Sequence, residues 1–401
     1  MDVSLTDEQR AWQLKARKFA QEELRPISLQ RDQVVDSRET FDWEIIKKGS
    51  KLGFRTAVVP KEWGGHGIDL VTQALVMTEL AKGDSAMAKT FSQCWKWSHL
   101  IEARCTPDQK ERFVKPFVAD DTYLLGYAGT EPSAGSDHRL PPKDDLKAGW
   151  KLKAERKGDE WILNGEKCFI ANASVAKLFF VGTRTNSNAS QREGTTVFLV
   201  PIDTPGLRVG RVSNKSGWRF YQNGELIFEN ARVPHANLVG EVNRGTYLRG
   251  TSHPFGDFEL GANALGICDA AVEMAMQHVQ TRWQDAKYFI DNQTIQLKLS
   301  EMRMLTEALR SFVMRVAAEG FVMRDAAEGD AKTGHYASFL QNFGADVVQR
   351  VTVLNLDIHG GAGVMTIDAG AEKLVRDAVI WTHNVGDSVQ RMRAIRQNIG
   401  F

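Results

Sequence analysis

The chain has 401 residues, 42% hydrophobic and 25% charged, a composition ordinary for globular proteins with a sizeable core. Its 51 basic and 50 acidic side chains nearly cancel, and no apolar run approaches the roughly 18 residues of a membrane helix, so neither nucleic acid nor a membrane is expected as a partner. The polar N-terminus and four widely spaced cysteines, with no CxxC pair, predict a cytoplasmic protein with buried thiols and no metal site.

The first stretch, residues 1–122, carries helical patterns. Thr6 and Gln9 have the spacing of a capping box, and apolar residues then recur at the helical period. Pro26 is expected to end or kink this first helix. Two further helical patterns run over residues 43–52 and 70–80.

The middle stretch, residues 123–240, changes character. It contains short β-rich runs bounded by turn residues, and the Asn164-Gly165 pair is typical of a hairpin turn. A small, mostly antiparallel β domain is predicted here.

The last stretch, residues 241–401, is helical again. Four long patterns with short connections predict a four-helix bundle. They cover residues 256–285, 293–327, 334–357 and 371–396. The fold class is therefore α+β, with a sheet domain between two helical parts.

Six segments, spread in order over the whole chain, resemble the acyl-CoA dehydrogenase family. In the middle stretch they are residues 127–137 (TEPxAGSD motif), 164–172 (NGxKxWITN) and 217–234 (GxR and the strand after it). In the last stretch they are Arg282 with Gln293, residues 358–364 (the glycine turn) and residues 374–378 (LxRDA). The resemblance implies an N-terminal helical domain, a middle β domain and a C-terminal four-helix bundle.

The resemblance also implies FAD as cofactor. Backbone N–H groups of a glycine-containing turn and an arginine fork suit the phosphates of such a cofactor. Taken singly, the motif turn is equally a polar loop and the arginine a surface residue. The resemblance implies flavin contacts from Thr130 and Ser136 of one subunit and from Arg282 and the Gly361 turn of a neighbouring subunit, so a homodimer or homotetramer is expected. The other implied cofactor residues are Tyr127, Gly129, Gly135, Phe169, Ala171 and Gly386 and, in the last stretch, Gln293 and Asp357.

The sequence departs from the family at the catalytic base. The family takes a proton with a carboxylate, and ungapped counting puts Asn384 at its commonest position. An alternative register puts Val385 there, and the position used by another branch is Gly256. The arginine that helps to hold the CoA arm is replaced by Asp257.

Other departures surround the flavin ring. Phe169 stands where a tryptophan covers the flavin, and Ala171 where a threonine hydrogen-bonds flavin N5. Asp357 replaces a glutamine, and Asp285 replaces a phenylalanine. Residues 138–146 form an insertion after the TEPxAGSD motif.

These departures favour a reduced-flavin-dependent monooxygenase acting on a small aromatic molecule. Such an enzyme needs no base, and a separate flavin reductase would supply the reduced flavin. Asn384 and His383 would be its catalytic residues. Each tryptophan alone is more typical of core packing, whereas for Trp97 core packing and a place in the acyl channel weigh equally. The aromatic cavity would be lined by Phe91, Trp97, Phe169, Trp381 and His383.

Two alternatives remain open. One is an acyl-CoA dehydrogenase with a displaced base (Glu259, Asp257 or Asp387), which would pass electrons to an electron-transfer flavoprotein. The other is the base-lacking subunit of a heteromeric dehydrogenase. The predicted substrate site includes Phe91, Trp97, Trp381, Gly256, Asp257 and Glu259.

Overall fold

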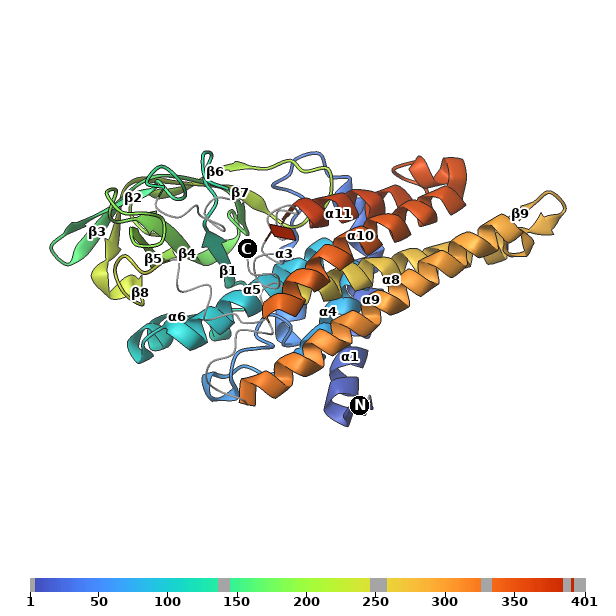
Figure 1. Cartoon of the computed structure of the whole chain (residues 1–401), viewed down its shortest axis with the longest axis horizontal. Helices are drawn as coiled ribbons and strands as arrows, with labels where there is room; N and C mark the ends of the chain where they lie inside the picture. The colour runs from blue at the N-terminus through green and yellow to red at the C-terminus, as the bar shows by residue number, and fades with distance from the viewer. Residues whose placement is uncertain (1–3, 136–144, 246–257, 326–333, 385–390, 393–401) are drawn as a thin grey trace.

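The computed structural model describes residues 4–135, 145–245, 258–325, 334–384 and 391–392. Helices precede and follow a sheet, which confirms the predicted α+β arrangement. In Figure 1 the sheet forms one end of an elongated molecule, and the long helices of the last stretch extend away from it.

The first stretch is helical, as predicted. Thr6 and Gln9 form the expected capping box, each side chain accepting from the other residue's backbone N–H. Pro26 does not end the first helix. A π-helical turn follows that helix, and Pro26 lies in the first turn of the next one, where proline is tolerated. The elements are α1 (Asp7–Phe19), η1 (Ala20–Leu24), α2 (Arg25–Asp32), α3 (Trp43–Lys51), η2 (Lys61–Trp63), α4 (Leu70–Gly83), α5 (Ser85–Arg104) and α6 (Pro107–Ala119).

The middle stretch forms one mixed sheet with the strand order β6-β7-β3-β2-β4-β5-β8 and with β1 beside β4. Its pairs are antiparallel except β1 with β4 and β2 with β4, so the prediction of a mostly antiparallel sheet is confirmed. The strands are β1 (Leu124–Ala128), β2 (Lys153–Lys157), β3 (Glu160–Ala171), β4 (Ala176–Arg184), β5 (Thr195–Pro201), β6 (Leu207–Val212), β7 (Asn223–Pro234) and β8 (Leu238–Val239).

The predicted hairpin turn at Asn164-Gly165 is wrong. The chain turns from β2 to β3 at Gly158 and Asp159, and Asn164-Gly165 lies inside β3, where the pairing with β7 shifts register. Gly165 has φ +137°, a conformation that favours glycine and that a β-bulge can use as readily as a turn.

The last stretch contains the four predicted helices. They are α8 (Phe258–Thr281), α9 (Gln293–Asp325), α10 (Gly334–His359) and α11 (Ala371–Asn384). The strand pair β9 (Trp283–Gln284) and β10 (Lys287–Tyr288) and the short helix η5 (Phe289–Asp291) connect α8 to α9, and η7 (Gly360–Val364) follows α10. α8 is buried on most sides because it packs against α4, α9 and α10. Its contact with α4 is close: a Cβ added to Gly266 would lie 2.5 Å from the carbonyl oxygen of Thr78.

A buried carboxylate at Asp377 ties the three parts of the chain together. It accepts hydrogen bonds from Lys373 Nζ (2.7 Å) on its own helix α11, from Ser85 Oγ (3.1 Å) on α5, and from the backbone N–H of Trp218 (2.7 Å) after β6. Lys373 also contacts Asp84 (3.1 Å), the N-cap residue of α5. The LxRDA segment therefore has a structural role, because it fixes the bundle to the sheet domain and to the first helices.

The cysteine side chains and the lengths of the helices bear on the expectations about disulfides and membranes. All four cysteines are buried and unpaired, as predicted. Over the described ranges, no helix is long and apolar enough to cross a membrane. Within the same residues, no group of three or more His, Cys, Asp or Glu side chains could hold a metal ion.

Candidate functional site

Phe169 presents a large aromatic ring at the surface. Its side chain is 63% exposed, while its neighbours Cys168 and Ile170 are buried. The residue has φ +55°, which is rare for a bulky side chain, and it lies where the pairing of β3 with β7 is interrupted. Its carbonyl oxygen accepts a hydrogen bond from Asn223 Nδ2 (3.1 Å), which holds this backbone conformation. An exposed ring fixed in this way offers a flat surface that a planar ligand would cover.

The turn after β1 lies beside this ring. The backbone N–H of Cys168 donates to the carbonyl oxygen of Thr130 (2.9 Å), and Lys167 Nζ donates to that of Gly129 (3.2 Å). Glu131 forms a buried ion pair with Lys167 (2.7 Å) and also accepts from two backbone N–H groups before β2. The glutamate of the TEPxAGSD motif therefore anchors the turn to β3 and is not available to a ligand.

The structure thus gathers the described members of the first predicted flavin group. Tyr127 is on β1, Ala171 ends β3, and Gly135 is exposed, with no atom within 4 Å of an added Cβ. Trp97 of α5 stacks on Tyr127, with ring centroids 4.6 Å apart. Ser136 and Gly386, predicted to belong to this group, lie outside the described residues.

The second predicted group lies at the other end of the molecule. Arg282 follows α8, Gln293 begins α9, Asp357 is near the end of α10, and Gly361 is in η7. All are exposed, and Asp357 contacts Lys298 at 3.3 Å. A tilted contact between the rings of His278 and His359, with centroids 4.2 Å apart, joins the ends of α8 and α10 here. Figure 1 shows this end, marked by β9, far from the sheet domain, so one chain cannot bring its own two groups together.

The same end of the bundle exposes apolar side chains. Leu297 (72% exposed) and Met304 (65%) are seven residues apart on α9 and so share a face of that helix. Exposed apolar patches of this kind mark sites of association between proteins. We call the set the distal apolar surface; its members are Trp283, Tyr288, Leu297 and Met304.

Glu259, one of the candidate displaced bases, is buried in the first turn of α8. It forms an ion pair with Lys89 Nζ of α5 (3.0 Å), and both side chains are almost inaccessible. One turn along α5, Gln93 Oε1 accepts from the hydroxyl of Tyr221 (2.9 Å). Burial, and then the charges of Glu259 and Cys94, raise the pKa of Tyr221 well above its ordinary value, so the phenol stays protonated and donates.

These polar partners were not predicted from the sequence. Lys89 and Gln93 are both buried and four residues apart on α5, and this spacing on one helix face is the signal that could have revealed them. Asp257 and Asp387, the other candidate bases, and Gly256 lie outside the described residues.

The predicted aromatic cavity is not assembled as expected. Phe91 packs on Phe19 and Phe54 (centroids 6.4 and 6.2 Å) in the core of the first helices. Trp381 is fully buried in the bundle and donates from Nε1 to the carbonyl oxygen of Leu260 (3.0 Å). His383 is exposed. The predictions for Phe91 and Trp381 are therefore corrected: both fill cores, because aromatic composition predicts burial but not which core a ring enters.

Asn384, the other residue predicted to be catalytic, is the last residue of α11. Of the predicted cavity residues, Trp97 and Phe169 remain beside the turn after β1.

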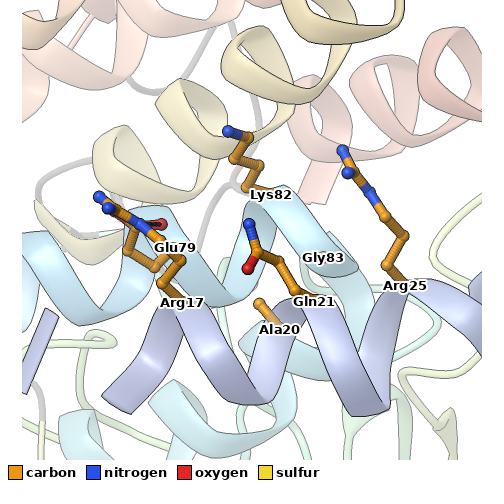
Figure 2. A pocket seen from close by; sticks show the side chains of 7 residues that line it. All are labelled: Arg17, Ala20, Gln21, Arg25, Glu79, Lys82 and Gly83. Atoms are coloured by element: carbon orange, nitrogen blue, oxygen red, sulfur yellow. Dashed lines mark hydrogen bonds and ion pairs between the residues drawn. The ribbon is translucent and has the colours of Figure 1, made fainter. Parts of the chain in front are cut away.

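A separate small pocket lies between the first helices and α4 (Figure 2). Arg17 pairs with Glu79 (2.7 Å), and Arg25 and Lys82 both pair with Glu273 of α8 (3.1 and 2.7 Å). The space measures about 10 Å³, roughly the room of one water molecule. This pocket is therefore a set of paired surface charges and not a second candidate site.

Family models match all three parts of the chain. The model described as "Acyl-CoA dehydrogenase, N-terminal domain" matches residues 6–121, the middle-domain model matches residues 126–231, and the C-terminal-domain model matches residues 243–399.

Individual proteins are similar over nearly the full length. A probable acyl-CoA dehydrogenase of Bacillus subtilis, YngJ, is 31% identical over 99% of both chains. The solved structure of butyryl-CoA dehydrogenase from Megasphaera elsdenii superposes with a TM-score of 0.88, at 30% identity over 98% of both chains. That of the prolyl acyl carrier protein oxidase AnaB has a TM-score of 0.85, at 25% identity over 98% of this chain and 99% of the other.

Proposed function

The chain belongs to the acyl-CoA dehydrogenase family of flavin-dependent oxidoreductases, and from this premise we propose that it oxidises a thioester-carried acyl group with bound FAD, Glu259 accepting the proton. Members of this family bind FAD. The observation that carries the proposal is the buried pair of Glu259 with Lys89, beside the segment that holds the exposed ring of Phe169.

Desaturation of an acyl thioester removes a proton from the α-carbon and a hydride from the β-carbon. FAD, when bound, supplies the hydride acceptor. The proton needs an ionised carboxylate within hydrogen-bond reach. Lys89 Nζ lies 3.0 Å from the buried carboxyl group of Glu259, and an opposite charge at this distance favours a carboxylate.

The residues of the sheet domain fit a flavin ring. Phe169 offers its exposed face, and Gly129, Thr130 and Gly135 present the turn beside it. Arg282 and Gly361 would reach the diphosphate part from a second copy, since they lie at the opposite end of their own chain. We therefore propose a homodimer, or a homotetramer built from two dimers, in which the distal apolar surface is covered.

Anaerobic titration of the oxidised holoprotein with a panel of acyl-CoA thioesters tests this function. Bleaching of the flavin band by one of them, followed by electron transfer to an electron-transfer flavoprotein, is the expected result. A flavin band unchanged by every thioester would contradict the proposal.

The second candidate is the monooxygenase that receives reduced flavin from a separate reductase. It is favoured by Ala171, which lacks the hydroxyl that would hydrogen-bond flavin N5, and by Asn384, which cannot take up a proton usefully. Its proposed aromatic substrate loses support, because Phe91 and Trp381 pack in cores. Rapid mixing of the reduced protein with oxygen distinguishes the two: a long-lived transient absorbance favours the monooxygenase, and direct reoxidation favours the dehydrogenase.

The double variant Leu297→Asp, Met304→Asp is expected to disrupt the dimer. Two charges in a covered apolar surface cannot be solvated, so the particle mass should halve, and FAD content should fall from about one per chain to less than about a tenth. Light scattering and flavin absorbance measure both quantities.

Leu14→Asp is the matched control, because Leu14 is 58% exposed on α1 and outside the distal apolar surface. It should change neither the mass nor the flavin content. If the double variant remained a dimer with full flavin content, the proposal that two copies of the chain share each FAD site would be contradicted. Well under one FAD per chain in the unaltered protein would instead favour the base-lacking subunit of a heteromeric dehydrogenase.

A further inference from the structure

The side chain of Lys215 is half-buried in the connection between β6 and β7. Its Nζ donates to the carbonyl oxygen of Tyr221 (2.5 Å) and to Asn223 Oδ1 (2.6 Å). No role in chemistry was predicted for this lysine, although it lies just before the Gly217-Trp218-Arg219 segment. A long side chain that ends inside the protein on two polar atoms, without an ion pair, needs a reason, because burying an ammonium group is costly.

The second of these bonds continues to the exposed aromatic ring. Asn223 uses Oδ1 to accept from Lys215 and Nδ2 to donate to the carbonyl oxygen of Phe169 (3.1 Å). A side-chain amide can turn by half a rotation and exchange these atoms, but a lysine amine that donates can be met only by the oxygen. Lys215 therefore sets the orientation in which Asn223 can hold Phe169.

The charge state of Lys215 agrees with this arrangement. Burial lowers its pKa to about 7; Asp377 of α11 opposes this change and Arg219 of the same connection reinforces it. Among the described residues these are the charged groups that act on it, and the ring of Tyr221 also faces the amine, with its centroid 5.2 Å from Nζ. The two N–H groups of an uncharged amine match the two oxygen acceptors, and the third N–H of an ammonium would face the ring.

We propose that Lys215 is a positioning residue for the flavin: through Asn223, its amine fixes the left-handed backbone at Phe169, against which the flavin ring lies. This inference rests on the proposed FAD site and is independent of whether the reaction is a dehydrogenation or an oxygenation. Lys215 itself touches no reacting atom.

A pH dependence of flavin binding follows. A flavin on Phe169 buries the region further and so disfavours the ammonium form of Lys215. FAD affinity should therefore rise as the pH rises through about 7, the pKa of this amine, and should level off above it.

Stability should follow pH in the same direction. The unfolded lysine titrates at the ordinary value of 10.5 and the folded one at about 7, so between these values the unfolded chain binds more protons. The free energy of unfolding should therefore rise with pH across this window, and the lysine's contribution to that slope should be absent without the amine.

The test measures the FAD dissociation constant by flavin fluorescence from pH 6 to 9 in Lys215→Met and Asn223→Asp. Both variants should bind FAD about tenfold more weakly at pH 8, the loss expected for one buried hydrogen bond. In Lys215→Met the rise through about pH 7 should also disappear. Asn223→Asp keeps an acceptor for Lys215 but lacks the donor to Phe169. It therefore tests whether this hydrogen bond sets FAD affinity, even if Lys215→Met does not fold.

Lys177→Met is the control, because Lys177 pairs with Asp120 (2.5 Å) and Thr122 (3.0 Å) in the same part of the chain, without contact to Phe169. It should bind FAD as the unaltered protein does. Unaltered affinity in both test variants would overturn the proposal for Lys215. If the unaltered protein itself bound no FAD, the proposed function would fail instead.

Discussion

Glu259→Gln is expected to slow flavin reduction by an acyl thioester by roughly 10²–10⁴-fold, the usual contribution of a general base. Glutamine has nearly the same shape and can still accept a hydrogen bond from Lys89, which now donates to Glu259 at 3.0 Å. It cannot take up a proton. FAD content should therefore be unchanged, while the rate of bleaching after anaerobic mixing falls; stopped-flow absorbance measures this rate.

Glu79→Gln provides the matched control. Glu79 is also a buried glutamate in an ion pair, with Arg17 at 2.7 Å, but it lies on α4 beside the first helix. Its replacement should leave the rate of flavin reduction unchanged. A Glu259→Gln variant that reduces its flavin at the full rate would remove Glu259 as the base and direct attention to Asp257 and Asp387.

The largest loss of stability is expected from Asp377→Ala. The change removes the acceptor for Lys373, Ser85 and the Trp218 N–H at once, and it leaves the Lys373 ammonium buried with Asp84 alone. Breaking a buried pair by removing one partner typically costs about 3–5 kcal/mol. Thermal unfolding followed by circular dichroism should show a large fall in the midpoint, and FAD content should fall with it.

Asp346→Ala is the comparison for that loss. Asp346 contacts Arg391 at 2.8 Å, but its side chain is 66% exposed. An exposed pair contributes about 0–1 kcal/mol, so the midpoint should barely move. Equal effects of the two substitutions would show that Asp377 does not tie the three parts of the chain together.

The sequence predicted the helices of the bundle closely, because their apolar periods run over several turns. Residues 127–137 and 164–172 were grouped through the resemblance of their motifs to the family, and the structure places Cys168 against Thr130. The bulge at Gly165 could not be separated from a hairpin turn, since both use the same backbone freedom of glycine.

Contacts between distant residues could not be predicted. Lys89 and Glu259 are 170 residues apart, and their pairing depends on how α5 meets the first turn of α8. Phe91 was expected in a cavity and packs on Phe19 and Phe54 instead, because the period of α5 places it on the face toward the first helices. The pattern of one helix shows which face is buried but not which distant element that face meets.

The separation of the two flavin groups along the molecule has a genetic consequence. In the proposed dimer each site takes Phe169 from one copy and Arg282 from the other. A copy damaged at Phe169 and a copy damaged at Arg282 are each inactive alone, since every site in either homodimer lacks one half. When the two are produced together, a mixed dimer contains one site with both defects and one site with none. Two inactive alleles of this protein should therefore complement each other, whereas two alleles damaged in the same half should not.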